Sequence, residues 1–263
     1  MEATRATRSV QFVVCEPRRL IYRPLAKCAS TTVIDFLGDL GGYGERRDRR
    51  SFLPRRSGDV APGAGETYEV RCSADMLAGF VGRYADYVWF SVVREPYGRV
   101  KSNYFNKLNR YARRFEPRVY VAAYLQQLLA GRALWRPGNE QNRAKHLRKH
   151  ISFPRFVDAL RRHGIDWDIH FALQTDLLRG DVVPYHRLIR MESLLEGLRD
   201  VVELVDATAE AKPALENLKR LNSSSGSPAA EGELWTPECR RIVADLYRRD
   251  FDELGYAAGS QAA

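Results

Sequence analysis

The sequence predicts a single α/β domain over residues 1–263, in which helices flank a central parallel sheet and further helices form insertions. Strand-like and helical patterns alternate along the chain, which is typical of this class. The run from Tyr87 to Val93 is apolar on both faces, as expected for a strand that helices cover on either side. With 263 residues, 44% of them hydrophobic, the chain can bury a large core, and this excludes disorder of the whole chain.

The first part of the chain predicts two strands, at residues 10–15 and 20–25, because both stretches are apolar and strand-like in composition. The segment that includes residues 33–37 then predicts a helix. Residues 41–66 are rich in Gly, Pro and Arg and lack periodicity, so we expect an exposed loop there, a candidate for ordering on ligand binding. A short strand is expected at residues 67–71.

The later elements follow the same alternation. A helix is expected from about Ser73, because Ser-Ala-Asp can cap a first turn, and the strand at 87–93 comes next. Pro96 stands where a further helix can start, and residues 111–163 are helical in pattern and strongly basic. The remaining predicted elements are a helix at 152–160, a strand at 185–190, a helix from about Glu192, a flexible stretch at 223–228 and a final helix at 236–254.

Charge and cysteine usage narrow the range of partners. Lys and Arg total 42 against 33 Asp and Glu, a net charge of +9, so the expected partners are anionic: a nucleotide, a nucleic acid, a sulfated or carboxylated glycan, or an acidic membrane surface. The four cysteines are widely separated and form no Cys-x-x-Cys pair, which predicts neither a structural metal nor a disulfide framework. No apolar signal region and no run of ~20 apolar residues occurs, so we expect a cytoplasmic protein without a transmembrane segment. A peripheral position at a membrane, or the secretory lumen if the sequence is part of a longer chain, are the alternatives.

The first segment with chemical information lies between the strand at 20–25 and the helix that follows it. It contains a lysine, small residues and three hydroxyl side chains at a helix N-terminus, which together favour binding of an anion. The six residues are Lys27, Cys28, Ala29, Ser30, Thr31 and Thr32. The arrangement is P-loop-like in its logic, but the Walker glycines are absent, which disfavours a nucleoside-triphosphate kinase.

The second segment follows the buried strand at 87–93. Arg94 leaves the strand end, and Ser102 comes eight residues later in the following helix. Ligands of α/β folds bind at the carboxyl ends of the strands, so these two residues can converge on a second phosphate there. Two anion sites at strand ends indicate a ligand with two separated phosphates.

Together the two segments resemble the cofactor signatures of sulfotransferases that use 3′-phosphoadenosine 5′-phosphosulfate (PAPS), specifically the carbohydrate sulfotransferase family 2, which includes chondroitin and related enzymes. In that family a Lys-x-x-Ser/Thr-Thr-Ser/Thr loop holds the 5′-phosphosulfate, and residues 27–32 match it, with Cys28 as a local departure. An Arg-Glu/Asp-Pro-aromatic-x-Arg-x-x-Ser-x-Tyr segment holds the 3′-phosphate. It is matched by Arg94, Glu95, Pro96, Tyr97, Arg99, Ser102 and Tyr104.

Weaker matches extend this similarity over nearly the whole chain. Residues 168–174 resemble the family segment that contains a His followed by a Gln, and residues 189–194 resemble its strand-to-helix element with a glutamate. Residues 221–224 and 244–256 resemble the family's C-terminal ending. Their order along the chain supports the resemblance.

The resemblance implies transfer of a sulfuryl group from PAPS to a hydroxyl, less favourably an amine, of a carbohydrate or another hydroxylated acceptor, with release of adenosine 3′,5′-bisphosphate and without a metal. Lys27 would stabilise the charge on the leaving phosphate oxygen. Of the five histidines only His170 lies in a family-like segment, so it is the candidate general base. Related heparan-type enzymes place their base just before the second signature, where this chain has no His, and the base is therefore open.

Other interpretations remain open. The basic stretches at 94–118 and 143–163 could bind an anionic glycan, but solvated helix faces are the slightly better explanation. Acceptor pockets are built from loops, here expected at residues 41–66 and 105–150. The alternatives to a sulfotransferase are a P-loop-like small-molecule kinase and a non-catalytic protein that binds a nucleotide or a nucleic acid. A nucleic-acid partner is not expected, because neither a recognition helix nor an aromatic and basic sheet face occurs.

Overall fold

The computed structural model describes residues 9–42, 53–63, 65–114, 152–166, 168–222 and 234–258, apart from the side chains of 107–114 and 219–222. The predicted flexible stretch at 223–228 and most of the basic segment at 111–163 lie outside these residues. The chain forms two compact units, which we call the sheet unit (residues 1–95 and 167–226) and the helical unit (residues 96–166 and 227–263). The expectation of a single domain stays a prediction.

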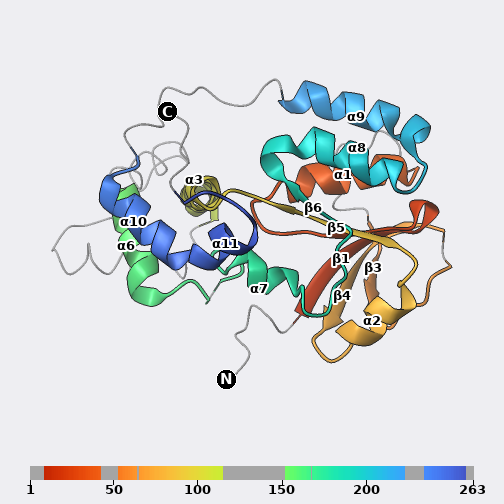
Figure 1. Cartoon of the computed structure of the whole chain (residues 1–263), viewed down its shortest axis with the longest axis horizontal. Coiled ribbons are helices and arrows are strands. Elements are labelled where there is room, and N and C mark those ends of the chain that lie inside the picture. Colours follow the sequence, from red (N-terminus) through yellow and green to blue (C-terminus); the bar gives the residue numbers. More distant parts are fainter. Residues whose placement is uncertain are drawn as a thin grey trace. The chain divides into compact units, whose positions relative to one another are not determined.

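The sheet unit contains six strands in the order β3-β4-β1-β2-β5-β6 (Figure 1). Their bounds are β1 Ser9–Cys15, β2 Leu20–Arg23, β3 Arg55–Ser57, β4 Thr67–Ser73, β5 Val88–Val93 and β6 Arg187–Arg190. β2, β5 and β6 run parallel, and so do β3 and β4. β1 is antiparallel to both of its neighbours, β2 and β4. Its connection to β2 through the 3-10 helix η2 (Glu16–Arg18) is too short for a parallel crossover. The predicted α/β class is confirmed.

Helices cover both faces of this sheet. The helices of the sheet unit are α1 Ser30–Leu40, α2 Leu77–Arg83, α7 Gln174–Leu178, α8 Leu194–Glu203 and α9 Thr208–Asn222, with a 3-10 helix η5 at Met191–Ser193. α1 and α8 lie on one face and α2 on the other (Figure 1). Under α2 the rings of Phe12 and Phe80 stack at 5.2 Å, and Trp89 meets Phe12 edge-on at 5.5 Å. The predicted buried strand, β5, lies inside the sheet between β2 and β6.

On the other face, α8 approaches β6 very closely. A Cβ atom placed on Gly197 of α8 would lie 2.9 Å from Cγ1 of Ile189 and closer still to its Cγ2. Ile189 is the buried residue of β6, a strand whose other positions are exposed. A glycine at position 197 is what allows the helix axis to come this near to the strand.

Two local expectations are wrong. β3 lies within residues 41–66, where we expected only a loop, and pairs in parallel with β4. Its sequence, Arg-Arg-Ser, has no apolar alternation to signal a strand, because the strand is short and at the sheet edge. The helix expected from Ser73 begins at Leu77, because Ser73 is the last residue of β4.

The helical unit contains α3 Pro96–Arg114, α6 Phe153–His163, α10 Pro237–Leu246 and α11 Arg248–Glu253. Its core is aromatic: Phe153 contacts Trp235 at 4.6 Å and Tyr104 at 5.2 Å between ring centroids. The predicted start of the last helix is confirmed, since Thr236 accepts a hydrogen bond from the Cys239 N–H as an N-cap does. In the described part of the chain, no helix of either unit is long and apolar enough to cross a membrane.

Candidate functional site

The loop between β2 and α1 has an unusual backbone conformation, closed by a hydrogen bond from the Cys28 N–H to the Leu25 carbonyl at 3.4 Å. Lys27 and Ala29 both have positive φ, 69° and 54°, which residues other than Gly adopt uncommonly. Ala29 is the N-cap of α1 and makes no side-chain cap, so the first N–H groups of the helix have no partner inside it. Backbone of this kind forms concave donor sites for anions. The left-handed residues thus take the conformations that glycines provide in a Walker loop.

The strand ends bring the second predicted segment to this loop. Arg23, the last residue of β2, is in register with Ser91 of β5, whose Oγ donates to the Arg23 carbonyl at 2.7 Å. The chain therefore leaves β2 and β5 at the same edge of the sheet. Beyond that edge, Nη1 of Arg94 donates to the Lys27 carbonyl at 3.3 Å. Lys27 and Arg94, predicted separately, are neighbours in the structure.

Gln174, the first residue of α7, joins the two segments. Its Nε2 donates to the Arg94 carbonyl and its Oε1 accepts from the Arg94 N–H, each at 2.9 Å. The same Oε1 is 3.2 Å from Sγ of Cys28 in the first loop. Gln174 is fully buried. One amide side chain therefore holds both halves of the predicted anion site.

This geometry limits what Cys28 can contribute. Its side chain is fully buried, and its thiol faces Gln174. Any contact of this residue with a phosphate therefore falls to its backbone. Ser30, Thr31 and Thr32 form the first turn of α1, where their hydroxyls and N–H groups are together at the positive end of the helix.

A carboxylate provides a second anchor for the residues after β5. Glu192, in η5 directly after β6, accepts a hydrogen bond from the Glu95 N–H at 3.1 Å. Arg94 and Glu95 are thus each bonded through their backbone to a side chain from a later segment of the chain. The turn after β5 is defined by these two anchors.

Arg23 adds a buried positive charge at the same edge. Its guanidinium donates to the carbonyls of Leu177, Gln11 and Pro24, with nitrogen to oxygen distances from 3.0 to 3.4 Å. Burial lowers its pKa, but a guanidinium stays protonated at neutral pH. Within the described part of the chain, all the acceptors of Arg23 are neutral backbone carbonyls. The edge therefore favours an anionic ligand.

His170 lies in the turn before α7. Its Nδ1 is 2.6 Å from Oδ1 of Asp168, and a quarter of its side chain is exposed. Only three residues separate it from Gln174, so the chain brings it close to the same edge. Ser102 lies in α3 of the helical unit, and its predicted role stays a prediction.

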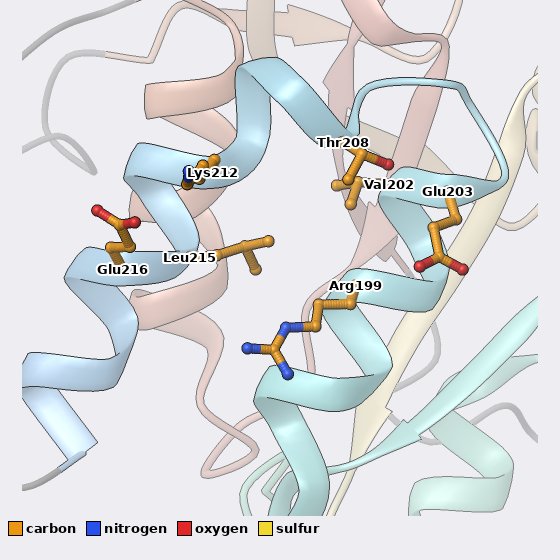
Figure 2. Close-up of a pocket in the computed structure, with 7 residues that line it drawn as sticks. All are labelled: Arg199, Val202, Glu203, Thr208, Lys212, Leu215 and Glu216. Carbon is orange, nitrogen blue, oxygen red and sulfur yellow. The ribbon is translucent and has the colours of Figure 1, made fainter.

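A cavity of about 290 Å³ lies elsewhere in the sheet unit, between α8 and α9. Arg199 of α8 and Leu215 of α9 point into the space between the two helices (Figure 2). The full lining is Arg199, Val202, Glu203, Thr208, Lys212, Leu215 and Glu216, which includes none of the predicted site residues. Two carboxylates offset its two cations, so it suits a phosphate ligand less well than the strand ends do. The described residues hold no group of three His, Cys, Asp or Glu that could bind a metal.

The fold is α/β, and the loop before α1, the N-terminus of α1 and the turn after β5 meet at one edge of the sheet, where α/β folds bind ligands. The sequence model of the sulfotransferase family matches residues 10–257, and the chain belongs to this family. The predicted resemblance is confirmed. The searches of curated proteins and of solved structures found no significant match.

Proposed function

We propose that this protein transfers a sulfuryl group from PAPS to a hydroxyl, less favourably an amine, of a carbohydrate or another hydroxylated acceptor. Membership of the sulfotransferase family supports sulfuryl transfer. The observation that carries the choice of donor is the hydrogen bond from Arg94 to the Lys27 carbonyl, together with the Gln174 amide that bonds both segments. Two cationic groups on adjacent strand ends suit a ligand with phosphates at both ends of a nucleoside.

Each site residue has a proposed role. The N–H groups and hydroxyls of Ser30, Thr31 and Thr32 would bind the 5′-phosphosulfate at the N-terminus of α1. Lys27 would neutralise the phosphate oxygen that leaves, and Arg94 would bind the 3′-phosphate through a guanidinium with five N–H donors. For Ser102, a role at the 3′-phosphate rests on its place in the sequence signature alone.

The chemistry follows from these positions. The acceptor oxygen attacks the sulfur of PAPS, a new S–O bond forms, and the bond from sulfur to the 5′-phosphate oxygen breaks. The electron pair of that bond stays on the phosphate oxygen, where a lysine ammonium lowers the energy of the developing charge. The hydroxyl proton passes to a general base, for which we propose His170. Positioning and charge stabilisation supply the rate enhancement.

Calorimetric titration with adenosine 3′,5′-bisphosphate tests the donor site. We expect the wild-type protein to bind this nucleotide, and Lys27→Ala and Arg94→Ala each to weaken the affinity at least tenfold, or about 1.4 kcal/mol. ATP should be a poor competitor. Lys212→Ala and Arg199→Ala are matched controls, because they remove the same charges from the cavity between α8 and α9.

The controls also distinguish the alternatives. Binding weakened by the two control substitutions and unaffected at Lys27 and Arg94 would place the nucleotide in the α8–α9 cavity and contradict the proposal. A preference for ATP with magnesium would favour a kinase. Radiolabelled PAPS with a panel of polysaccharides and small hydroxylated compounds would then identify the acceptor class.

A further inference from the structure

The turn that carries His170 has a fixed geometry. The carbonyl of Asp168 accepts hydrogen bonds from the N–H groups of Phe171 at 2.9 Å and Ala172 at 3.0 Å. Phe171 is fully buried, and Gln174 is anchored to Arg94. Four residues of chain span at most about 14 Å, so the Cα of His170 lies within that distance of the Gln174 Cα.

The Asp168 carboxylate holds the imidazole ring as well as the turn. Its Oδ1 accepts from the His170 backbone N–H at 2.9 Å and lies 2.6 Å from His170 Nδ1. An ionised carboxylate can only accept, so Nδ1 carries a proton and Nε2 of the neutral ring is the nitrogen without one. The two side chains are 25% and 17% exposed, which reduces the screening of this bond by water.

The turn does not require the contact between the Asp168 carboxylate and the His170 ring. An aspartate that only closes a turn of this type accepts from the N–H two residues later, and this is the bond to the His170 backbone. The short contact to the ring is additional, and it restrains rotation of the imidazole. A carboxylate on Nδ1 also stabilises the imidazolium that forms when Nε2 takes a proton.

We propose that Asp168 is a positioning residue for sulfuryl transfer, which sets the tautomer and orientation of His170 so that Nε2 receives the acceptor proton. This inference rests on the proposed function. As the acceptor oxygen bonds to sulfur and the 5′-phosphate oxygen leaves with the electron pair, the hydroxyl proton moves to Nε2 of His170. Asp168 keeps its charge throughout, and the imidazolium then returns its proton to water.

The first test is the tautomer of His170 in the full chain, read from ¹⁵N chemical shifts in histidine-labelled protein, with His170→Gln to assign the signals. We expect a protonated Nδ1 in the wild type. Asp168→Ser keeps an oxygen for the turn but cannot reach the ring, so its His170 should shift to the Nε2-protonated form that free imidazole side chains favour in water. A wild-type ring protonated on Nε2, or the same tautomer in Asp168→Ser, would overturn the proposal.

The second test is kinetic, with release of adenosine 3′,5′-bisphosphate from PAPS measured with desulfated chondroitin and with water alone as acceptor. We expect Asp168→Ser to lower kcat at least tenfold with the KM for PAPS within twofold, and Asp168→Asn, which retains an acceptor oxygen, to lie between. The control is Asp181→Ser, an exposed aspartate of the same unit that pairs with Arg179. It should leave both constants unchanged.

The possible outcomes distinguish failure of the proposed function from failure of the proposed role of Asp168. A chain that fails to bind adenosine 3′,5′-bisphosphate refutes the proposed function, and the inference with it. Normal nucleotide binding with an unchanged kcat in Asp168→Ser refutes only the role of Asp168. A loss confined to KM or to nucleotide affinity would assign Asp168 to the structure of the turn and would also overturn the proposal.

Discussion

The Gln174 amide offers the sharpest test of how the site is held together. Gln174→Met keeps the length and approximate volume of the side chain but removes its hydrogen-bonding groups. The substitution takes away the donor to the Arg94 carbonyl, the acceptor of the Arg94 N–H and the oxygen that faces the Cys28 thiol. Because the side chain is fully buried, water cannot replace these partners without a rearrangement.

The expected magnitude follows from these contacts. A buried hydrogen bond contributes about 1 kcal/mol net, and a backbone group left without a partner costs a further 1–3 kcal/mol, less where it is partly exposed. Two strong bonds and one weak thiol contact therefore predict that the free energy of unfolding falls by about 3 kcal/mol. Since the Lys27 loop and Arg94 lose their common anchor, the affinity for adenosine 3′,5′-bisphosphate should fall about tenfold.

Urea unfolding and calorimetric titration measure the two effects. The matched control is Gln11→Met on β1, because the Gln11 side chain makes no hydrogen bond within the described part of the chain, and its effect should stay within about 0.5 kcal/mol. Equal stability of Gln174→Met and Gln11→Met, with equal nucleotide affinity, would show that the amide does not join the two segments.

The remaining predictions concern packing and pH. Gly197→Ala should lower the free energy of unfolding by about 1–3 kcal/mol, because the new Cβ collides with Ile189. Gly82→Ala in α2 should raise it by about 0.5–1 kcal/mol, because no atom lies within 4 Å of the new Cβ. Urea unfolding in which both variants change stability in the same direction would contradict this. Burial raises the pKa of Cys72 to about 12, so above the unfolded value of about 8.5 the unfolded chain loses this proton first and stability falls as pH rises. Cys72→Ala should reduce that slope by up to about 1 kcal/mol per pH unit in unfolding measured from pH 8 to 10, and an unchanged slope would refute the assignment.

The closeness of two residues of the candidate site was predictable, because they follow neighbouring strands. A run apolar on both faces identifies an interior strand, and cationic residues that directly follow such strands must meet at one edge of the sheet. Arg94 directly follows the apolar strand β5, Lys27 lies in the loop after β2, and the Arg94 guanidinium donates to the Lys27 carbonyl in the structure. The α/β class and the interior position of β5 were predictable for the same reason.

What escaped prediction depends on contacts distant in sequence or on weak local signals. Gln174 bonds residues 80 and 146 positions away, and the resemblance of residues 168–174 to a family segment did not indicate which residues its amide contacts. β3 has only three residues and no apolar pattern. The Asp168–His170 pair was different, because an aspartate two residues before a histidine is a spacing that a closer inspection of the sequence could have found.

The order of the strands also has a consequence for synthesis of the chain. β5 pairs with β2 early, but its other edge is completed by β6, roughly 90 residues later in the sequence. At about 5–20 residues per second, a ribosome needs roughly 5–20 s to make the intervening chain. During that time the Val-Trp-Phe-Ser-Val-Val strand presents an unpaired apolar edge, which is a typical aggregation hazard. We therefore expect a chaperone that covers this strand until β6 has been made to increase the yield of soluble protein.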